Sequence, residues 1–408
     1  MKNIKSILTV LFLFAVCWNV TAQEVAIFPQ LGHSGSINSI AFSPDNKYIL
    51  SNSDDQTSKL WDINSGRIIR TFNNSFGSVI FSPNGNQILS GGANKIVLYD
   101  TNTGNEIWTI NDDNYSFVFN SNGRQIIYNG ANNNKILIDR LTGREIKTFR
   151  FIESIRNTLT FTPDGRNIIS VSEDLKLVLW DTVTGQEIRT FNGFAGNVFN
   201  LKFSPDGNQV LSYASEGIIK LWDIATGREN KAYSGFNWNG IDNGQFIDFS
   251  PDGNQIAALS SSRGIVKIWD IATGREIRTL TSQLNTLSGG TYGNHYVKFS
   301  QDGRQILAFL GSKGIIIWDV NSGREIINIS LEENNWLTTS EVIFSQDGRN
   351  IVFCHNYNVK ILEITSGREI RTINNFEYIS DITLSPDRRH IITGLRDGTI
   401  DLFDNPKI

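Results

Sequence analysis

Three residues near the start of the chain have the side chains of a nucleophilic catalytic site. His33, Ser53 and Asp55 could supply a base, a nucleophile and an orienting carboxylate. A serine nucleophile also needs an exposed turn and an oxyanion hole, and the surrounding sequence contains neither motif. We therefore expect no catalytic residues, and we predict that the protein is not an enzyme.

Metal and cofactor sites are not predicted either. The histidines fall in different segments, without the spacing of metal ligands, at His33, His295, His355 and His390. Cys354 and His355 are adjacent, and adjacent residues of a strand point to opposite faces, so they cannot easily share an ion. The sequence contains no calcium-binding loop and no glycine-rich phosphate loop. We expect no bound metal and no cofactor.

The elements that must position these residues belong to a repeat of roughly 40 residues, and such a period indicates stacked structural units. Five copies end an apolar run in Trp-Asp, at Trp61, Trp180, Trp222, Trp269 and Trp318. Four weaker copies end in a related pair, at Tyr99, Ile138, Leu362 and Phe403. The units follow one another without a linker, so residues 23–408 are expected to form a single domain.

Each unit carries the signals of four short strands. A turn such as Ser204–Gly207 suits a tight hairpin, because Pro presets φ and Gly accepts positive φ. The second strand and the run into Trp-Asp are rich in branched residues. A second turn, such as 226–228, precedes a fourth strand in which polar and apolar residues alternate, as in 187–191. Three buried strands and one half-exposed outer strand describe a propeller blade.

The pattern resembles the WD-repeat (tryptophan-aspartate repeat) β-propeller family, over almost all of residues 23–408. The segment 53–62, SDDQTSKLWD, is very close to that family's third-strand signature. The resemblance implies a buried hydrogen-bond lock within one blade, made by His33, Ser53, Asp55 and Trp61. The chain departs from the family pattern because the opening Gly-His pair survives only at 32–33 and four Trp positions are replaced.

We predict an all-β propeller of four-stranded antiparallel blades. Turn motifs and Trp-Asp positions both number nine, so nine blades are expected. The alternative is eight blades, with the third unit, around 119–139, distorted. The last unit ends after its third strand, while residues 24–31 form an orphan strand before the first unit. We expect strand 24–31 to complete the C-terminal blade and close the ring.

Residues 1–22 have the composition of a signal peptide. Lys2 and Lys5 precede an apolar run, and Ala22 provides the small residue that a signal peptidase requires. We expect an exported protein, periplasmic or secreted, that resembles bacterial members of the family and has no transmembrane segment after cleavage. The alternative is a lipoprotein tethered through Cys17.

Charge and cysteine content narrow the classes of partner. Removing residues 1–22 takes away two lysines and no acid, so the net charge of −4 becomes −6. A nucleic-acid partner is not expected, because no basic cluster is visible. Cys354 alone remains in the mature chain, so no internal disulfide can form. We expect a monomer stabilised by packing and strand pairing.

The connections into the sixth, seventh and eighth units are longer than the others, and they carry aromatic residues that a core does not require. These are Phe236, Trp238, Tyr292 and Trp336. Exposed aromatic residues are favoured at interfaces. We therefore predict a non-enzymatic scaffold that presents this aromatic sector to a protein partner. The alternatives are a glycan-binding propeller, with the same residues stacking on sugars, and a hydrolase or lyase with a site over the axial channel.

Overall fold

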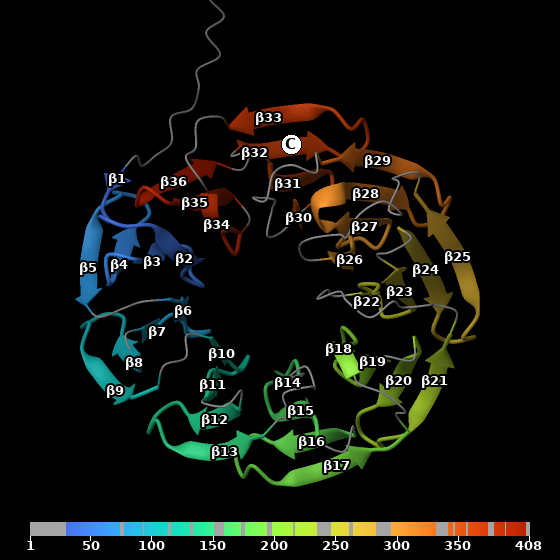
Figure 1. The fold of residues 1–408 in the computed structure, drawn as a ribbon, viewed down its shortest axis with the longest axis horizontal. Helices are drawn as coiled ribbons and strands as arrows, with labels where there is room; N and C mark the ends of the chain where they lie inside the picture. Colours follow the sequence, from blue (N-terminus) through green and yellow to red (C-terminus); the bar gives the residue numbers. More distant parts are fainter. Residues whose placement is uncertain are drawn as a thin grey trace, which may run out of the picture.

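The chain forms a ring of nine four-stranded antiparallel sheets around a central axis in the computed structural model (Figure 1). The structure describes residues 30–73, 77–92, 94–112, 116–130, 134–150, 159–172, 176–193, 198–214, 217–234, 246–260, 264–282, 295–331, 342–345, 347–355, 358–373, 379–387 and 389–404. The predictions of an all-β propeller and of nine blades are confirmed. The third unit is a complete four-stranded blade, so the eight-bladed alternative is wrong.

The strands are listed by blade, from the innermost to the outermost. Blades 1 to 3 are β2 (Ile37–Phe42), β3 (Tyr48–Ser53), β4 (Thr57–Asp62), β5 (Ile68–Asn73); β6 (Val79–Phe81), β7 (Gln87–Gly92), β8 (Lys95–Asp100), β9 (Glu106–Ile110); and β10 (Phe117–Phe119), β11 (Gln125–Asn129), β12 (Lys135–Asp139), β13 (Glu145–Phe149). Blades 4 to 6 are β14 (Leu159–Phe161), β15 (Asn167–Val171), β16 (Leu177–Asp181), β17 (Glu187–Phe191); β18 (Val198–Phe203), β19 (Gln209–Ala214), β20 (Ile219–Asp223), β21 (Glu229–Tyr233); and β22 (Ile247–Phe249), β23 (Gln255–Ser260), β24 (Ile265–Asp270), β25 (Glu276–Thr281). Blades 7 to 9 are β26 (His295–Phe299), β27 (Gln305–Leu310), β28 (Gly314–Asp319), β29 (Glu325–Ser330); β30 (Val342–Phe344), β31 (Asn350–His355), β32 (Asn358–Glu363), β33 (Glu369–Ile373); and β34 (Ile379–Leu384), β35 (His390–Leu395), β36 (Thr399–Asp404), β1 (Gln30–Leu31). A short 3-10 helix, η2 (Gly311–Lys313), lies between β27 and β28.

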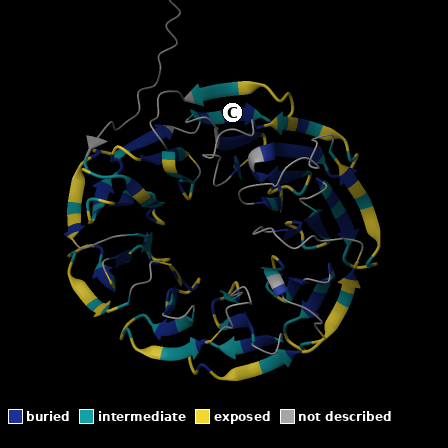
Figure 2. Cartoon of the chain, viewed as in Figure 1, coloured by how far each residue is buried: buried dark blue, intermediate teal, exposed yellow. Residues whose placement is uncertain are grey.

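Burial follows the strand position within each blade. Second strands such as β3 are almost wholly buried, and third strands such as β4 and β24 alternate buried and half-buried residues. Outer strands such as β5 and β25 are mostly exposed. Figure 2 shows this as a buried middle layer inside an exposed rim. The alternation read in the sequence therefore marks the one strand of each blade that faces solvent.

Blades 1 to 8 share a β-bulge at one place, and blades 1, 5 and 9 have a register shift between their first and second strands. The outer strand pair shifts register between Leu60 and Trp61 in blade 1, and the same shift recurs at the equivalent position in blades 2 to 8. A bulge increases local twist and redirects the strand. The Trp position therefore marks the point where the outer strand bends just after the turn that precedes it.

The ring closes through the chain ends, as predicted. β1 pairs antiparallel with β36, with Gln30 opposite Ile400 and Leu31 opposite Thr399. The apolar cluster at this junction joins Ile37 of blade 1 to Ile392 and Leu402 of blade 9. Residues 24–29 of the predicted strand lie outside the described residues. The closing blade is thus held both by backbone hydrogen bonds between β1 and β36 and by a buried apolar cluster.

Side chains of the outer strands also reach the neighbouring blade. Arg70 donates to Asn102 O (2.8 Å), Arg189 to Thr226 O (2.9 Å) and Arg278 to Ser322 O (3.1 Å). Lys231 donates to Ala272 O, and Trp108 donates through Nε1 to Arg140 O (2.7 Å). Each donor is the third residue of its outer-strand pattern and each acceptor lies in the next blade's turn. These contacts are called the inter-blade hydrogen bonds below.

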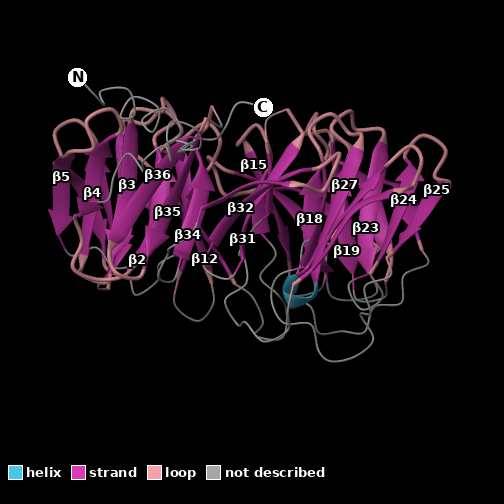
Figure 3. Ribbon diagram, turned by 90° about the horizontal axis from the view of Figure 1, so that it is seen from above, coloured by secondary structure: helices cyan, strands magenta, loops and turns pink. Residues whose placement is uncertain are grey.

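The two faces of the ring carry different connections (Figure 3). On one face lie the turns between first and second strands and between third and fourth strands, such as 43–47 and 63–67; we call it the AB–CD face. On the other lie the turns between second and third strands, such as 54–56, and the connections between blades; we call it the BC–DA face. Among the described residues no helix is long and apolar enough to cross a membrane.

Candidate functional site

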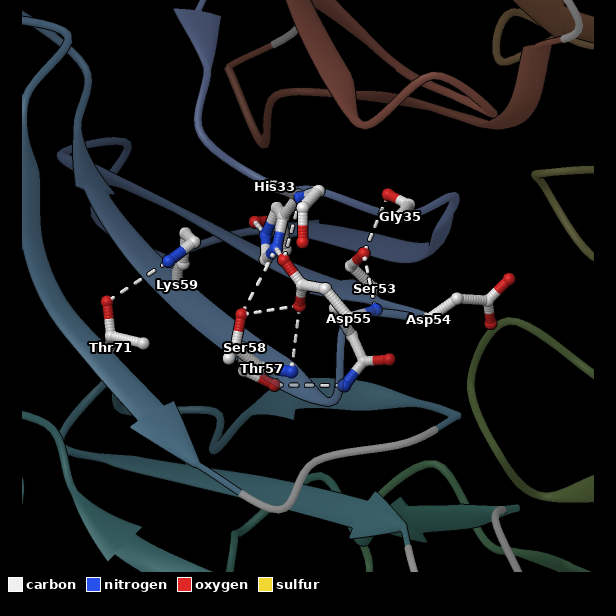
Figure 4. A network of polar contacts seen from close by, with 12 residues as sticks. His33, Gly35, Ser53, Asp54, Asp55, Thr57, Ser58, Lys59 and Thr71 are labelled. Carbon is white, nitrogen blue, oxygen red and sulfur yellow. Dashed lines mark hydrogen bonds and ion pairs between the residues drawn. The ribbon is translucent and has the colours of Figure 1, made fainter.

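His33 lies at the centre of a polar network in blade 1 (Figure 4). Its Nδ1 is 2.9 Å from Asp55 Oδ2, and its Nε2 is 2.8 Å from Ser51 Oγ. Trp61 donates through Nε1 to the same Ser51 Oγ at 2.8 Å. The network therefore joins the segment between β1 and β2 to both central strands of the blade.

Ser51, rather than Ser53, links the histidine to the tryptophan. Ser53 was expected in this position from the family resemblance, but its hydroxyl donates to Gly35 O (2.7 Å) and accepts from Asp55 N (3.1 Å). Both serines are on β3 and both are fully buried. Ser53 thus stabilises the turn that carries Asp55, while His33 and Trp61 both bond to Ser51.

The directions of the hydrogen bonds fit a neutral imidazole. The Trp61 N–H donates to Ser51, the Ser51 hydroxyl can donate to His33 Nε2, and His33 Nδ1–H can donate to Asp55. Burial lowers the pKa of His33, and the attraction of Asp55 opposes this without overcoming it. We infer that His33 is uncharged at neutral pH.

The Asp55 carboxylate is held ionised by its donors. Burial alone would raise its pKa, but hydrogen bonds from the Thr57 hydroxyl (2.6 Å), Ser34 N (3.0 Å) and His33 lower the pKa to about 2. Thr57 N also donates to it at 2.9 Å. Asp55 is therefore saturated with donors, as the cap of a turn is.

This geometry does not support nucleophilic catalysis. The His33 side chain has no exposed surface, and Ser51 is fully buried, so no substrate can reach either group. A nucleophile must be accessible and face donors for an oxyanion. The network instead fixes the entry segment of the blade against its central strands.

Part of this network recurs in other blades without the histidine. Trp180 donates to Ser170 and Trp222 donates to Ser212, each at 2.8 Å. In all three pairs the serine precedes the tryptophan by ten residues. A serine ten positions before the Trp was therefore a sequence signal for Ser51.

The aspartate of each Trp-Asp pair caps the turn that follows it. Asp223 Oδ1 accepts from Thr226 Oγ1 (2.6 Å) and Thr226 N (2.7 Å), and Asp270 accepts the same two bonds from Thr273. The hydroxyl bond first, and then the backbone bond, lowers the pKa of both carboxylates. These acids stabilise turns on the AB–CD face rather than forming a reaction centre.

The predicted aromatic sector cannot be located in the structure. Phe236, Trp238, Tyr292 and Trp336 all lie outside the described residues. The strands that flank their connections are described: β21 and β22, β25 and β26, and β29 and β30. All three connections begin and end on the BC–DA face, in successive blades.

The histidines do not come together. His295 lies on β26, His355 on β31 and His390 on β35, in three different blades. Within the described part of the chain no group of three His, Cys, Asp or Glu side chains could hold a metal ion. The side chains of Cys354 and His355 lie outside the description.

Sequence comparison identifies repeats of one family in this chain. The profile of the family described as WD domain, G-beta repeat, matches residues 23–62, 143–181, 185–223, 245–270 and 367–404. Each matched segment ends at or next to a Trp-Asp pair or its equivalent. The strong copy at Trp318 lies outside these segments, whereas the weaker copy at Phe403 lies inside one.

Curated relatives match over short stretches. Ribosome assembly protein 4 of Saccharomyces cerevisiae is 44% identical over 55 residues, which are 14% of this chain and 11% of that protein. Target of rapamycin complex subunit LST8 of the same organism is 34% identical over 61 residues, 14% of this chain and 20% of that protein. WD repeat-containing protein 1 of Mus musculus is 42% identical over 53 residues, 13% and 9% of the two chains. The matched region thus spans no more than a fifth of any of these relatives.

Solved structures match over nearly the whole chain. The computationally designed Ika8 protein superposes with a TM-score of 0.59 at 19% identity, covering 93% of this chain and 99% of that one. The C-terminal WD40 domain of Sif2 superposes with a TM-score of 0.58 at 14% identity, covering 91% and 97%. These likenesses concern the fold alone. The repeat matches and the nine-bladed ring together show a β-propeller that contains repeats similar to the WD domain, G-beta repeat.

Proposed function

We propose that this protein is an exported, non-enzymatic scaffold that binds a protein partner through its BC–DA face. WD40 propellers generally serve as protein–protein interaction scaffolds. The buried network around His33 offers no reactive group to solvent. A rigid ring that presents surface rather than chemistry fits this role.

The uneven length of the connections between blades carries the proposal. The connections 234–246, 282–294 and 331–341 are long, whereas 74–78 and 374–378 are short. The long ones follow one another around the ring and contain Phe236, Trp238, Tyr292 and Trp336. Loops on a rigid scaffold can vary without disturbing its core, and binding residues concentrate on them.

The AB–CD face is less suited to a partner. Its turns are short, and their polar groups are already used by internal hydrogen bonds such as Ser204 Oγ to Asp206 Oδ1 (2.5 Å) and Ser250 Oγ to Asp252 Oδ1 (2.6 Å). A partner would find few unsatisfied groups there. Leu141 and Val183 are exposed apolar residues on this face and supply a matched control.

Crosslinking capture with three forms of the full-length protein tests the binding face. The experiment measures how much of one crosslinked product each form yields. The three forms are the wild type, a Trp238→Ala/Trp336→Ala variant and a Leu141→Ala/Val183→Ala variant. We expect capture by the wild type and the control, and its loss in the Trp variant. Equal capture by all three forms would reject the aromatic sector as the binding site. If instead the wild type binds a glycan array and the Trp variant does not, the partner is a sugar rather than a protein.

Export is tested separately from binding. We propose that residues 1–22 direct the chain out of the cytoplasm and are cleaved after Ala22, with Gln23 as the new N-terminus. Cell fractionation and N-terminal sequencing should find the mature chain outside the cytoplasm. A Cys17→Ser variant should be exported in the same way, whereas a lipoprotein would lose its membrane attachment. Cytoplasmic retention of the intact chain would overturn the proposal.

A further inference from the structure

A cavity of about 410 Å³ lies between blades 3 and 4. Its walls come from β10, β11 and β12 on one side and from β14 on the other, including Val118, Ile127, Asn129, Lys135, Leu159 and Phe161. The first strands of the blades are the innermost (Figure 1), and Val118 on β10 is 50% exposed. The cavity therefore opens toward the central channel. Its volume is typical of small-molecule sites, roughly 300–1,000 Å³.

Lys135 breaks the repeat pattern at this cavity. It stands four residues before Asp139, the acid that ends its strand. The residues four positions before the corresponding acids in the other eight blades are all small or aliphatic and all buried: Ser58, Ile96, Leu177, Ile219, Val266, Ile315, Val359 and Ile400. Blade 3 alone therefore places an ammonium group where its neighbours fill the space between blades.

Among the described residues, the Lys135 ammonium has one hydrogen-bond partner. It donates to Asn129 Oδ1, on the residue directly across the strand pair. Burial lowers the pKa of Lys135, with no acidic group contributing. In the part of the chain that the structure describes, no carboxylate lies within ion-pair distance of this lysine. Since an ammonium has three N–H donors, the described contact uses one of them, on a side chain that is half-buried.

Blade 1 shows how the same position is satisfied when no ligand is needed. There the equivalent residues are Asn52 and Ser58, and Asn52 Nδ2 donates to Ser58 Oγ at 3.0 Å. Asn52 Oδ1 also accepts from Gly77 N, in the connection to the next blade, at 3.1 Å. The polar pair of blade 1 is thus complete within the protein. The pair in blade 3 carries a charge that no described group neutralises.

The remaining walls of the cavity combine apolar side chains with the hydroxyl residues Ser116, Ser121, Thr160 and Thr162. Val118 and Ile127 line it from blade 3, and Leu159 and Phe161 line it from blade 4. The described apolar cluster between these blades has four buried members, Ile127, Leu137, Phe149 and Ile168. The cavity runs beside β10 from Ser116 to Ser121, with Lys135 and Asn129 near the Ser116 end, because Asn129 N bonds to Ser116 O.

We propose that this cavity binds an elongated small molecule with an apolar body and one carboxylate, which accepts hydrogen bonds from Lys135 and from the Asn129 amide. The apolar body lies along Val118, Leu159 and Phe161. Lys135 is the one cationic residue in the described lining, which suits a monoanion, because a doubly charged phosphate would keep one uncompensated charge beside it. The site is independent of the binding face proposed above, since its walls are strands of the ring.

Calorimetric titration of the full chain with octanoate tests the site. Three control ligands are compared with it. Octanol has an alkyl chain but no charge, octylamine has an alkyl chain and a positive charge, and inorganic phosphate has negative charge but no alkyl chain. We expect octanoate to bind most tightly, octanol more weakly, and octylamine and phosphate not at all. Failure of octanoate to bind, binding of octylamine with equal affinity, or displacement of octanoate by phosphate would each overturn the proposal.

Two variants and a control place the binding in this cavity. Lys135→Met removes the charge and gives blade 3 an apolar residue like those of its neighbours, so the fold should persist. We expect it to weaken octanoate about tenfold or more, and to leave octanol unchanged. Val118→Phe should weaken both by filling the cavity. Lys95→Met, in blade 2 and outside the cavity, should bind as the wild type does; unchanged octanoate affinity in Lys135→Met would overturn the assignment.

Discussion

The hydroxyl of Ser51 joins three segments that are separate in the sequence, and strand alternation could not distinguish it from Ser53. The two serines are two residues apart, so they lie on the same face of β3. The register of β3 against β4, with Ile49 opposite Trp61, decides which one the indole reaches. Strand alternation could thus predict the residue types of the network but not the serine, which the ten-residue spacing before the Trp in three blades identifies.

Replacing Ser51 with Ala should destabilise blade 1 more than replacing Ser53. Ser51→Ala removes the shared hydroxyl and leaves the Trp61 N–H and His33 Nε2 buried without this partner, which should cost about 2–4 kcal/mol. Ser53→Ala removes one bond to Gly35 O and should cost about 1 kcal/mol. Thermal unfolding of the two variants checks the order; an equal loss would contradict the central role of Ser51.

The buried histidine should make stability depend on pH in a defined window. Because the pKa of His33 is lowered from 6.5 in the folded chain, the unfolded chain binds a proton more readily, and stability falls as the pH drops below about 6.5. A His33→Asn variant lacks this contribution. The difference in Tm between wild type and variant should therefore shrink between pH 7 and about 5. A constant difference would show that His33 is not held neutral.

At lower pH, the carboxylates should determine how the stability of the fold depends on pH. Hydrogen bonds from the following Thr hydroxyl and N–H lower the pKa of Asp223 and Asp270 from 3.8, and the donors around Asp55 lower its pKa to about 2 despite burial. Stability from these groups is complete above about pH 4 and is lost as the pH falls through their folded values. Circular dichroism during acid titration should show unfolding below about pH 4 and little change above it.

At the scale of the strands, the residues of the turns allowed most of the strand boundaries to be predicted. Pro, Asp and Gly at fixed offsets marked the hairpin between first and second strands, and Thr-Gly marked the hairpin before the outer strand. The bulge at each Trp position was not predicted, because it depends on the pairing of two strands rather than on either one. The pairing of Lys135 with Asn129 could not be predicted for the same reason, because it depends on the register of β11 against β12.

The inter-blade hydrogen bonds were also beyond the sequence, since they join residues more than 30 positions apart, such as Arg278 and Ser322. Arg278→Met keeps much of the side-chain stem but removes its bonds to Ser322 O and Asn321 O, so the Tm should fall, corresponding to about 1 kcal/mol. Arg275→Met, three residues earlier and exposed, is the matched control and should change stability by less than about 0.5 kcal/mol. Similar losses in both variants would mean that the contact between blades contributes nothing.

At the scale of the whole molecule, the number of blades and the mode of closure followed from counting. Nine turns and nine Trp-Asp positions gave nine blades, and a missing outer strand at one end matched a spare strand at the other. Those inferences held because each blade repeats the same local chemistry. The aromatic sector differs: it falls in long connections that no repeat pattern constrains, so its arrangement stays a prediction.

Removing the closing strand should open the ring. A chain lacking residues 1–31 cannot pair β36, and an exposed strand edge promotes association. We expect a lower Tm and aggregates in size-exclusion chromatography. A chain lacking only residues 1–22 retains β1 and should be monomeric and as stable as the chain that contains them. If both truncations behave alike, β1 is not needed for closure.

The pairing of Gln30 with Ile400 also means that the order of blades along the gene is not fixed by the shape of the ring. A short linker from the end of β36 to the start of β1 would make the ninth blade continuous, and the chain could then be opened between β5 and β6 instead. Such a circular permutant would keep every sheet while moving both ends to another sector. It would offer a fusion point on a chosen side of the molecule.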